Sequence, residues 1–212
     1  MKKIDINFKN LNNIKERFYI KDIQKFLTYH FEHPNDTIVV VDGLFGTGKT
    51  TILQQLAQIY KNNPEFKDKI VFYDIESNDT MDDIYDILEK REFQIYCFND
   101  ITNVKDFVGL SACLADIYAK YKMGIIVSGD NSAEFSFASH SLFDREIVFS
   151  TNYFPYIEAK QILNFDIDDY VKYGGLTDKN LIKNYDDFKQ YLDKYIIDNI
   201  IISAKNLNII II

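Results

Sequence analysis

The sequence predicts an α/β fold built on a doubly wound parallel sheet, followed by a helical C-terminal extension. Short, continuously apolar segments, which are typical of buried parallel strands, alternate with segments whose apolar residues recur at helical spacing. A glycine-rich loop joins the first of these strands to the helix that follows it. Strands separated by helices run parallel and carry helices on both faces, so this alternation predicts the doubly wound arrangement.

The elements follow one another in a regular order along the first 150 residues. The predicted strands are residues 37–42 (TIVVVD), 69–74 (KIVFYD), 94–98 (QIYCF), 124–128 (GIIVS) and 146–150 (EIVFS). The predicted helices are residues 49–60, 81–88 and 104–121, the second of them capped by Asp79 or Thr80.

The chain divides near residue 165, where the alternation of strands and helices gives way to an acidic, tyrosine-rich helical pattern. We therefore expect residues 1–165 to form one domain with a short N-terminal helical lead-in. Residues 166–212 are expected to form an acidic helical extension, which could also begin a truncated second domain.

Composition narrows the classes of partner. The net charge of −8 disfavours a broad basic surface for nucleic acid.

Cys97 and Cys113 fall in apolar or helical patterns, which we interpret as reduced core residues of a cytoplasmic protein. The apolar stretch 196–212 is interrupted by charged and amide residues, so no membrane span is expected. The three histidines are not at metal-ligand spacing, so no metal site other than a Mg²⁺ site is assigned.

The glycine-rich loop, residues 43–50 (GLFGTGKT), has the complete pattern of a phosphate-binding P-loop. Gly43, Gly46 and Gly48 allow successive N–H groups to converge on phosphate oxygens at the start of a helix. Lys49 then supplies charge to the β- and γ-phosphates, and the Thr50 hydroxyl is a Mg²⁺ ligand. The loop therefore predicts a P-loop NTPase fold that binds ATP with Mg²⁺. The other residues expected to line the nucleotide are Leu44, Phe45, Thr47, Thr51 and Asn131.

Later segments add a family resemblance. Together with the loop, YCFNDIT, GIIVSGDNS, SLFDR and YVKYGG resemble the AAA+-type P-loop predicted ATPases of bacteria and archaea over roughly residues 15–180. In that family the ATPase domain is usually followed by a winged-helix segment and a nuclease-like domain. The resemblance implies that this chain is the ATPase half, without the C-terminal nuclease-like domain.

The resemblance also implies an acid pair where an apolar strand ends beside the loop. The family has Asp-Glu there, whereas this sequence has Asn99-Asp100 after four apolar residues. An amide brings no negative charge to the metal, so we expect Asp100 to be the remaining acid, as metal ligand or as the group that orients water. Asp74, which ends the preceding strand, is the second choice for the metal. On this pattern, Asn99→Asp should raise turnover.

Two further positions are implied by the family pattern. A polar residue after the fourth strand, such as Asn131 in the SGDNS segment, would sense the γ-phosphate. Arg145, one of three arginines in the chain, matches an arginine that would clamp the same phosphate. Asp144 replaces the glycine that precedes this arginine in the family, and an ion pair with it would hold Arg145 locally instead.

The sequence leaves three functions open. The first is a slow AAA+-like ATPase whose catalytic positions are Asp100, Asn99 and Arg145. The second is a nucleotide-binding switch that does not hydrolyse ATP. The third is a nucleotide kinase, which the few, unclustered arginines disfavour because a kinase must clamp two phosphorylated ligands. A protein partner or a homo-oligomer is compatible with each of the three.

Overall fold

The computed structural model describes residues 1–11, 14–32, 38–44, 46–104, 114, 123–129, 146–151, 154–173, 189–190 and 193. By their contacts, residues 1–45 and 49–152 form one unit, and residues 46–48 and 153–212 form a second. The first unit contains a sheet with helices, and the described part of the second contains two short helices.

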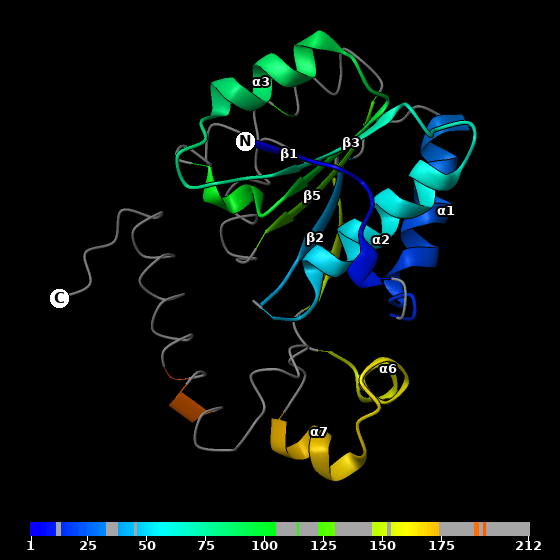
Figure 1. The fold of residues 1–212 in the computed structure, drawn as a ribbon, viewed down its shortest axis with the longest axis vertical. Coiled ribbons are helices and arrows are strands. Elements are labelled where there is room, and N and C mark those ends of the chain that lie inside the picture. Colours follow the sequence, from blue (N-terminus) through cyan, green and yellow to red (C-terminus); the bar gives the residue numbers. More distant parts are fainter. Residues whose placement is uncertain are drawn as a thin grey trace, which may run out of the picture. The chain divides into compact units, whose positions relative to one another are not determined.

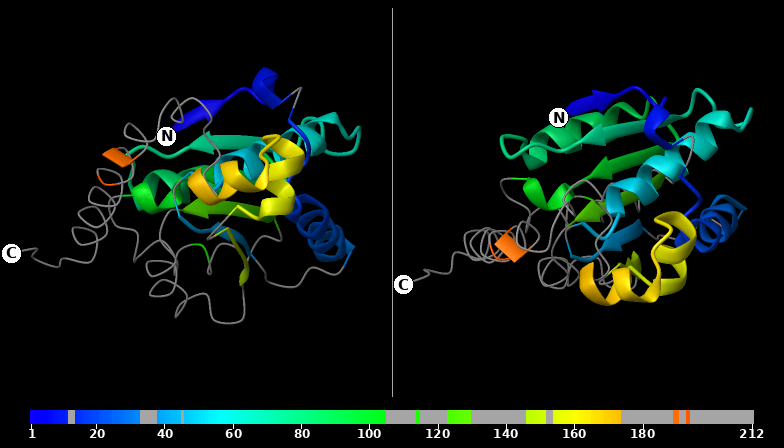
Figure 2. Two further views of the ribbon diagram at one scale, coloured as in Figure 1. Left: turned by 90° about the horizontal axis from the view of Figure 1, so that it is seen from below. Right: turned by 60° about the horizontal axis from the view of Figure 1, so that its bottom comes forward.

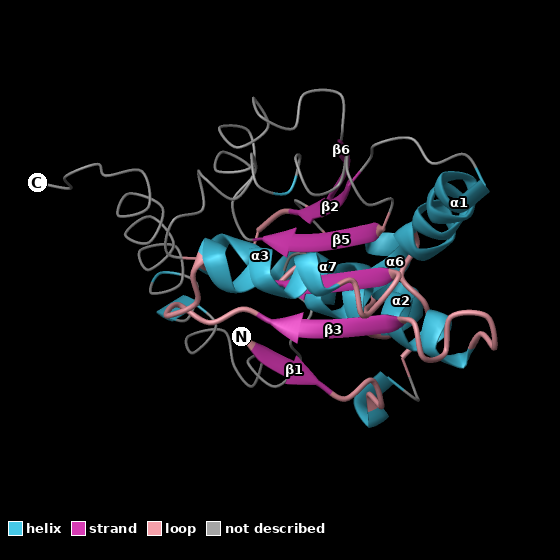
Figure 3. Cartoon of the chain, turned by 90° about the horizontal axis from the view of Figure 1, so that it is seen from above, coloured by secondary structure: helices cyan, strands magenta, loops and turns pink. Residues whose placement is uncertain are grey.

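The sheet has the strand order β1-β3-β4-β5-β2-β6, which Figure 3 shows from above. Its strands are β1 (Lys2–Ile4), β2 (Ile38–Asp42), β3 (Ile70–Asp74), β4 (Ile95–Asn99), β5 (Gly124–Gly129) and β6 (Glu146–Ser150). The five strands from β2 to β6 pair in parallel. The predicted α/β class with a parallel sheet is confirmed, and the predicted strands begin and end within one residue of those observed.

Strand β1 was not predicted. It pairs antiparallel with β3 at the edge of the sheet, so the N-terminal lead-in is a strand and a 3₁₀ turn, η1 (Lys9–Leu11), before it becomes helical. Three residues are too few to show an alternating pattern in the sequence. Lys2 and Lys3 lie on this edge strand, where lysines hinder pairing with another chain.

Helices cover both faces of the sheet, as Figure 1 shows. Helices α1 (Tyr19–Glu32) and α2 (Lys49–Asn62) pack on one face through a core that includes Ile23, Leu53 and Phe72. Helix α3 (Met81–Lys90) packs on the other through a core that includes Leu88 and Phe98. The predicted helix at 104–121 lies outside the described residues, apart from Val104 and Leu114.

Helix α3 begins where the sequence predicted a cap. The Thr80 side chain accepts a hydrogen bond from the Asp83 N–H, and the Asp83 carboxylate accepts one from the Thr80 N–H. This reciprocal pair satisfies two backbone donors that a helix start otherwise leaves unpaired. The Thr80 hydroxyl also donates to Asp83 Oδ2 at 2.7 Å, and this bond, followed by the bond from the Thr80 N–H, lowers the pKa of Asp83.

The second unit contains helices α6 (Tyr156–Ile162) and α7 (Ile167–Tyr173), coloured yellow in Figure 2. They pack through a small core of Phe154, Ala159 and Phe165. The Tyr170 hydroxyl donates to the Phe154 carbonyl at 2.7 Å, which ties α7 to the start of this segment. None of the helices in the described residues is long and apolar enough to span a membrane.

Candidate functional site: the glycine-rich loop and the adjoining strand ends

The glycine-rich loop leaves strand β2 and enters helix α2 at Lys49. Gly43, Gly46 and Gly48 have φ angles of 138°, 72° and 88°, a region that other residues rarely adopt. The sequence placed glycine at each of these positions, and the backbone requires it there. Residues with positive φ just before a helix are typical of loops whose backbone N–H groups bind an anion.

Gly43 also allows a close approach to the end of strand β6. A Cβ atom on Gly43 would lie 2.5 Å from Thr151 Oγ1 and 2.7 Å from the Thr151 carbonyl carbon. Thr151 is fully buried, and its backbone N–H and hydroxyl donate to the Asp42 carbonyl at 2.7 and 2.8 Å. These two hydrogen bonds from Thr151, which follows strand β6, therefore hold the peptide group between Asp42 and Gly43 in place.

Lys49 folds back under the loop. Its side chain is 4% exposed, and its Nζ donates to the carbonyl oxygens of Gly43 at 3.1 Å and Leu44 at 2.7 Å. These contacts hold a positive charge beside the start of α2, where the helix dipole also favours an anion.

The other predicted loop residues differ in exposure. Thr47 is buried, Thr50 and Thr51 are half-buried, and Leu44 is 59% exposed. Phe45, Asn131 and Arg145 lie outside the described residues.

A polar cluster lies where three strands end on the face of the sheet that carries α2. Side chains alternate along a strand, so Asp74, Asn99 and Ser128 share the face of Phe72, Cys97 and Ile126, which pack against that helix. In the β3–β4 register Asp74 pairs directly with Asn99. The structure thus brings the first and second choices for the acid, Asp100 and Asp74, to the same edge of the sheet.

The strand that carries Asn99 is not the direct neighbour of the strand that enters the loop. The family pattern implies an acid where a strand ends beside the loop, and β5 lies between β4 and β2. The strand beside β2 on this side ends at Ser128 and Gly129. Strand order depends on contacts between distant segments, so the pattern of one strand does not reveal its neighbour.

Asn99 lies at the centre of this cluster and is 3% exposed. Its Nδ2 donates to Asp74 Oδ1 at 2.8 Å and to Asp100 Oδ2 at 3.0 Å. Its Oδ1 accepts from Ser128 Oγ at 3.0 Å, and that same Oγ accepts from the Asp100 N–H at 3.0 Å. Both hydrogens of the amide are therefore used.

Asp100 itself adopts the left-handed conformation, with φ 56° and ψ 47°, at the start of a short 3₁₀ turn, η2 (Ile101–Asn103). Aspartate tolerates this region better than most residues, at a cost of about 1–3 kcal/mol. The turn follows β4 directly.

A buried and a half-buried carboxylate, Asp42 and Glu146, lie on the opposite face of the sheet. Asp42 is 4% exposed, and neither its Oδ1 nor Glu146 Oε2 has a hydrogen-bond partner in the described structure. Burial, and next the nearby charge of Asp42, raise the pKa of Glu146 above its ordinary value. A raised pKa means that the folded protein binds a proton that the unfolded chain releases, so stability falls as the pH rises from about 4.5.

Glu146→Gln should therefore stabilise the protein at pH 7. The amide avoids the cost of placing a charge in this half-buried position, so the thermal midpoint should rise. Differential scanning calorimetry at pH 7 and at pH 4 checks this. The two proteins should have nearly equal midpoints at pH 4, and a lower midpoint for the variant at pH 7 would contradict the assignment.

Two negative findings limit the site. Among the described residues, no group of three or more His, Cys, Asp or Glu side chains is placed to hold a metal ion by itself. Cys97 is a free, fully buried thiol whose burial raises its pKa to about 12, so it is a core residue and not a nucleophile.

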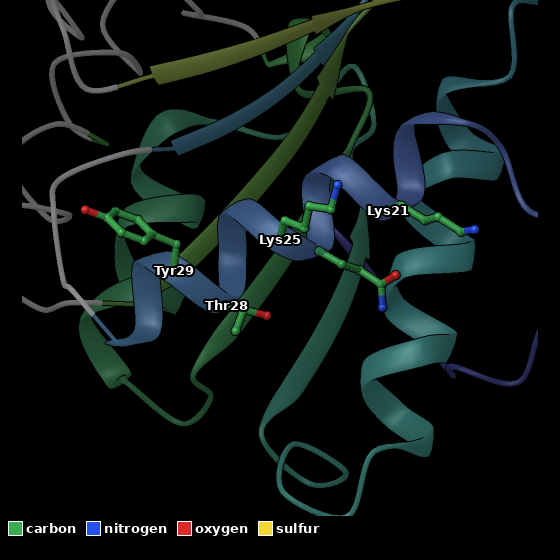
Figure 4. A pocket seen from close by; sticks show the side chains of 5 residues that line it. Lys21, Lys25, Thr28 and Tyr29 are labelled. Carbon is green, nitrogen blue, oxygen red and sulfur yellow. The ribbon is translucent and has the colours of Figure 1, made fainter.

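A hollow of about 520 Å³ lies along helix α1 (Figure 4). Its lining residues are Lys21, Gln24, Lys25, Thr28 and Tyr29. All five residues belong to one exposed face of helix α1. The Nζ atom of Lys25 lies 3.6 Å from Asp22 Oδ1, so this lysine is already paired. We assign it no function.

The sequence did not reveal Thr151 or the central role of Asn99. Thr151 follows the predicted strand 146–150 directly, and a hydroxyl at that place becomes informative only once β6 is known to lie beside β2. The bonds of Asn99 likewise depend on the pairing of β3, β4 and β5.

No protein-family model and no curated protein matches this sequence. Solved structures match by fold. PCH-2 from C. elegans superposes with a TM-score of 0.51 at 16% identity, over 81% of this chain and 52% of that one. Cdc6p from Pyrobaculum aerophilum gives 0.50 at 16% identity, over 90% and 59%. Hsp104 from S. cerevisiae, in its complex with casein, gives 0.51 at 13% identity, over 97% and 40%.

This chain thus spans between 40% and 59% of the length of these three structures. At such identities the likeness extends to the fold alone, which is the α/β arrangement on a parallel sheet that the sequence predicted. Function has to be argued from the site itself.

Proposed function

We propose that this chain binds ATP with Mg²⁺ at residues 43–51 and hydrolyses it slowly. The observation that carries the proposal is the loop: three glycines with positive φ lie between a buried strand and a helix whose first residue is a buried lysine. Backbone N–H groups, a helix start and an amine in this order form a binding site for phosphate groups.

The residues present also fit a magnesium ion. Magnesium in phosphate-binding sites takes one or two protein oxygens and completes its shell with water and phosphate oxygens. The Thr50 hydroxyl, together with the carboxylate of Asp100 or Asp74, would supply such oxygens, so a separate three-ligand cluster would not be required. When bound, the ion neutralises charge on the phosphates.

Within this proposal each part of the chain has a separate task. The loop and Lys49 bind and orient the phosphates, and Asp100 orients the attacking water. Arg145 and Asn131 remain proposed γ-phosphate contacts on the basis of the family resemblance. Assembly with a protein partner or with further copies, a cytoplasmic location and the division near residue 165 are proposals of the same kind.

Asp100→Ala tests the hydrolytic part. The variant should lose at least about 100-fold in turnover, the usual contribution of one acid–base group, while its affinity for Mg·ATP changes little because the loop holds the phosphates. Phosphate release and calorimetric binding, measured on the same preparations, separate the two effects. Normal hydrolysis by the variant would remove Asp100 from the mechanism.

A non-hydrolysing switch is the second candidate, because a specific contact favours it. The amide of Asn99 donates a hydrogen bond to both carboxylates of the cluster, so each of them has a partner within the chain itself. Saturable Mg·ATP binding by the wild-type chain, with no phosphate release above that of Asp100→Ala, would favour this function over hydrolysis.

A further inference from the structure

We propose that Asn99 is a positioning residue, which holds Asp100 through a bridge between neighbouring strands, and not a weakened metal ligand. The inference rests on the proposed function and reverses what the sequence pattern implies for this position. An aspartate at residue 99 would then impair the site instead of restoring it.

The bridge follows from the polarity of the groups around Asn99. Two carboxylates, Asp74 and Asp100, lie within hydrogen-bond distance of the same side-chain atom, Nδ2. Carboxylates only accept hydrogen bonds, and an amide nitrogen is the group that donates to both at once. Hydrogen bonds to ionised acceptors are the stronger class, so this amide is matched to its surroundings.

The other end of the amide extends the bridge to a third strand. Asn99 Oδ1 accepts from Ser128 Oγ, which in turn accepts from the Asp100 N–H. Asp100 is therefore held twice, at its carboxylate by Asn99 and at its backbone by Ser128. This second hold matters because Asp100 has the left-handed backbone conformation, which the surrounding bonds must maintain.

An aspartate at residue 99 would break this pattern. It would lose both donor hydrogens and place a third carboxylate, at a position that is 3% exposed, between the half-buried carboxylates of Asp74 and Asp100. Like charges that share a buried site repel and shift one another's protonation, and the bond that aims Asp100 is lost. The loop is not part of the bridge, so the effect should fall on kcat and not on KM.

The experiment compares Asn99→Asp with the exchanged double variant Asp74→Asn/Asn99→Asp and with Asn78→Asp. The double variant keeps the atoms and net charge of the wild type, because one carboxylate and one amide exchange places between paired residues. Asn78→Asp adds the same negative charge at an exposed position in the loop after β3. For each protein we would measure kcat and KM for Mg·ATP, and the thermal midpoint without nucleotide or metal.

Asn99→Asp should lower kcat by about tenfold or more with KM unchanged, and should lower the thermal midpoint by about 5 °C. The double variant should recover at least half of the loss in midpoint, because the amide introduced at position 74 can donate to the new carboxylate at position 99. Asn78→Asp should match the wild type in all three measurements. If Asn99→Asp does not fold, Ser128→Ala, which removes one end of the bridge, should still lower kcat without changing KM.

A rise in kcat for Asn99→Asp would overturn the inference and support the metal-ligand interpretation. A lower midpoint with unchanged kcat would also overturn it, because Asn99 would then support the fold alone. Absence of turnover in the wild type is a different failure: it removes the proposed hydrolysis, and with it the positioning role. If the wild type hydrolyses ATP and Asn99→Asp does so equally well, only the positioning role of Asn99 is ruled out.

Discussion

Lys49→Ala should abolish tight binding of Mg·ATP. The change removes the loop's buried ammonium group, which Gly43 and Leu44 hold beside the start of α2. Charge-assisted contacts of this kind contribute about 1.5–3 kcal/mol, so the dissociation constant should rise by about 10- to 150-fold. Isothermal titration calorimetry measures this change directly.

Lys61→Ala is the matched control, because Lys61 lies in the last turn of the same helix and approaches Asp68 at 3.9 Å near the surface. It should bind Mg·ATP as the wild type does. A Lys49→Ala protein that keeps the wild-type dissociation constant, and the wild-type thermal midpoint, would show that nucleotide does not bind at this loop.

Gly43→Ala should destabilise the protein strongly and distort the loop. The new Cβ would meet Thr151 at 2.5 Å, on a backbone with φ of 138° that alanine rarely adopts. Strain of this kind costs about 1–3 kcal/mol before the steric overlap is counted, so a fall of about 6–12 °C in the thermal midpoint is expected for 3 kcal/mol. Nucleotide affinity should fall as well, because the first peptide of the loop must move.

A second variant separates side-chain overlap from backbone overlap. The Thr151 carbonyl carbon and oxygen would lie 2.7 and 2.9 Å from the new Cβ, so removing the Thr151 hydroxyl cannot clear the space. Gly43→Ala combined with Thr151→Ala should therefore stay at least as unstable as Gly43→Ala. Full recovery in the double variant would show that the Thr151 hydroxyl alone is the obstacle.

Local features of the fold were predictable from the sequence, and non-local ones were not. The loop, the helix that follows it and the Thr80 cap each depend on residues within a few positions of one another, and all have the predicted structure. The parallel sheet was predicted because the alternation of strands and helices constrains it. Strand β1 was missed because its three residues carry no period of their own.

The candidate site divides in the same way. The glycine loop is a run of consecutive residues, so glycine at positions 43, 46 and 48, where φ is positive, could be interpreted from the sequence alone. The polar cluster is formed by side chains at the ends of β3, β4 and β5. Its hydrogen bonds depend on the register that pairs Asp74 with Asn99. In the family pattern, Asn99 stands where an acid would be expected. In the structure, its amide donates hydrogen bonds to two acids, Asp74 and Asp100.

The central claim is that the loop at residues 43–50 binds ATP. Calorimetric titration of the purified chain with Mg·ATP tests it most directly, because the measurement requires no turnover and no partner. Saturable binding at one site is expected, with a stoichiometry near one and a dissociation constant that rises in Lys49→Ala. No saturable heat up to millimolar ATP, together with no change in thermal midpoint on adding Mg·ATP, would contradict it.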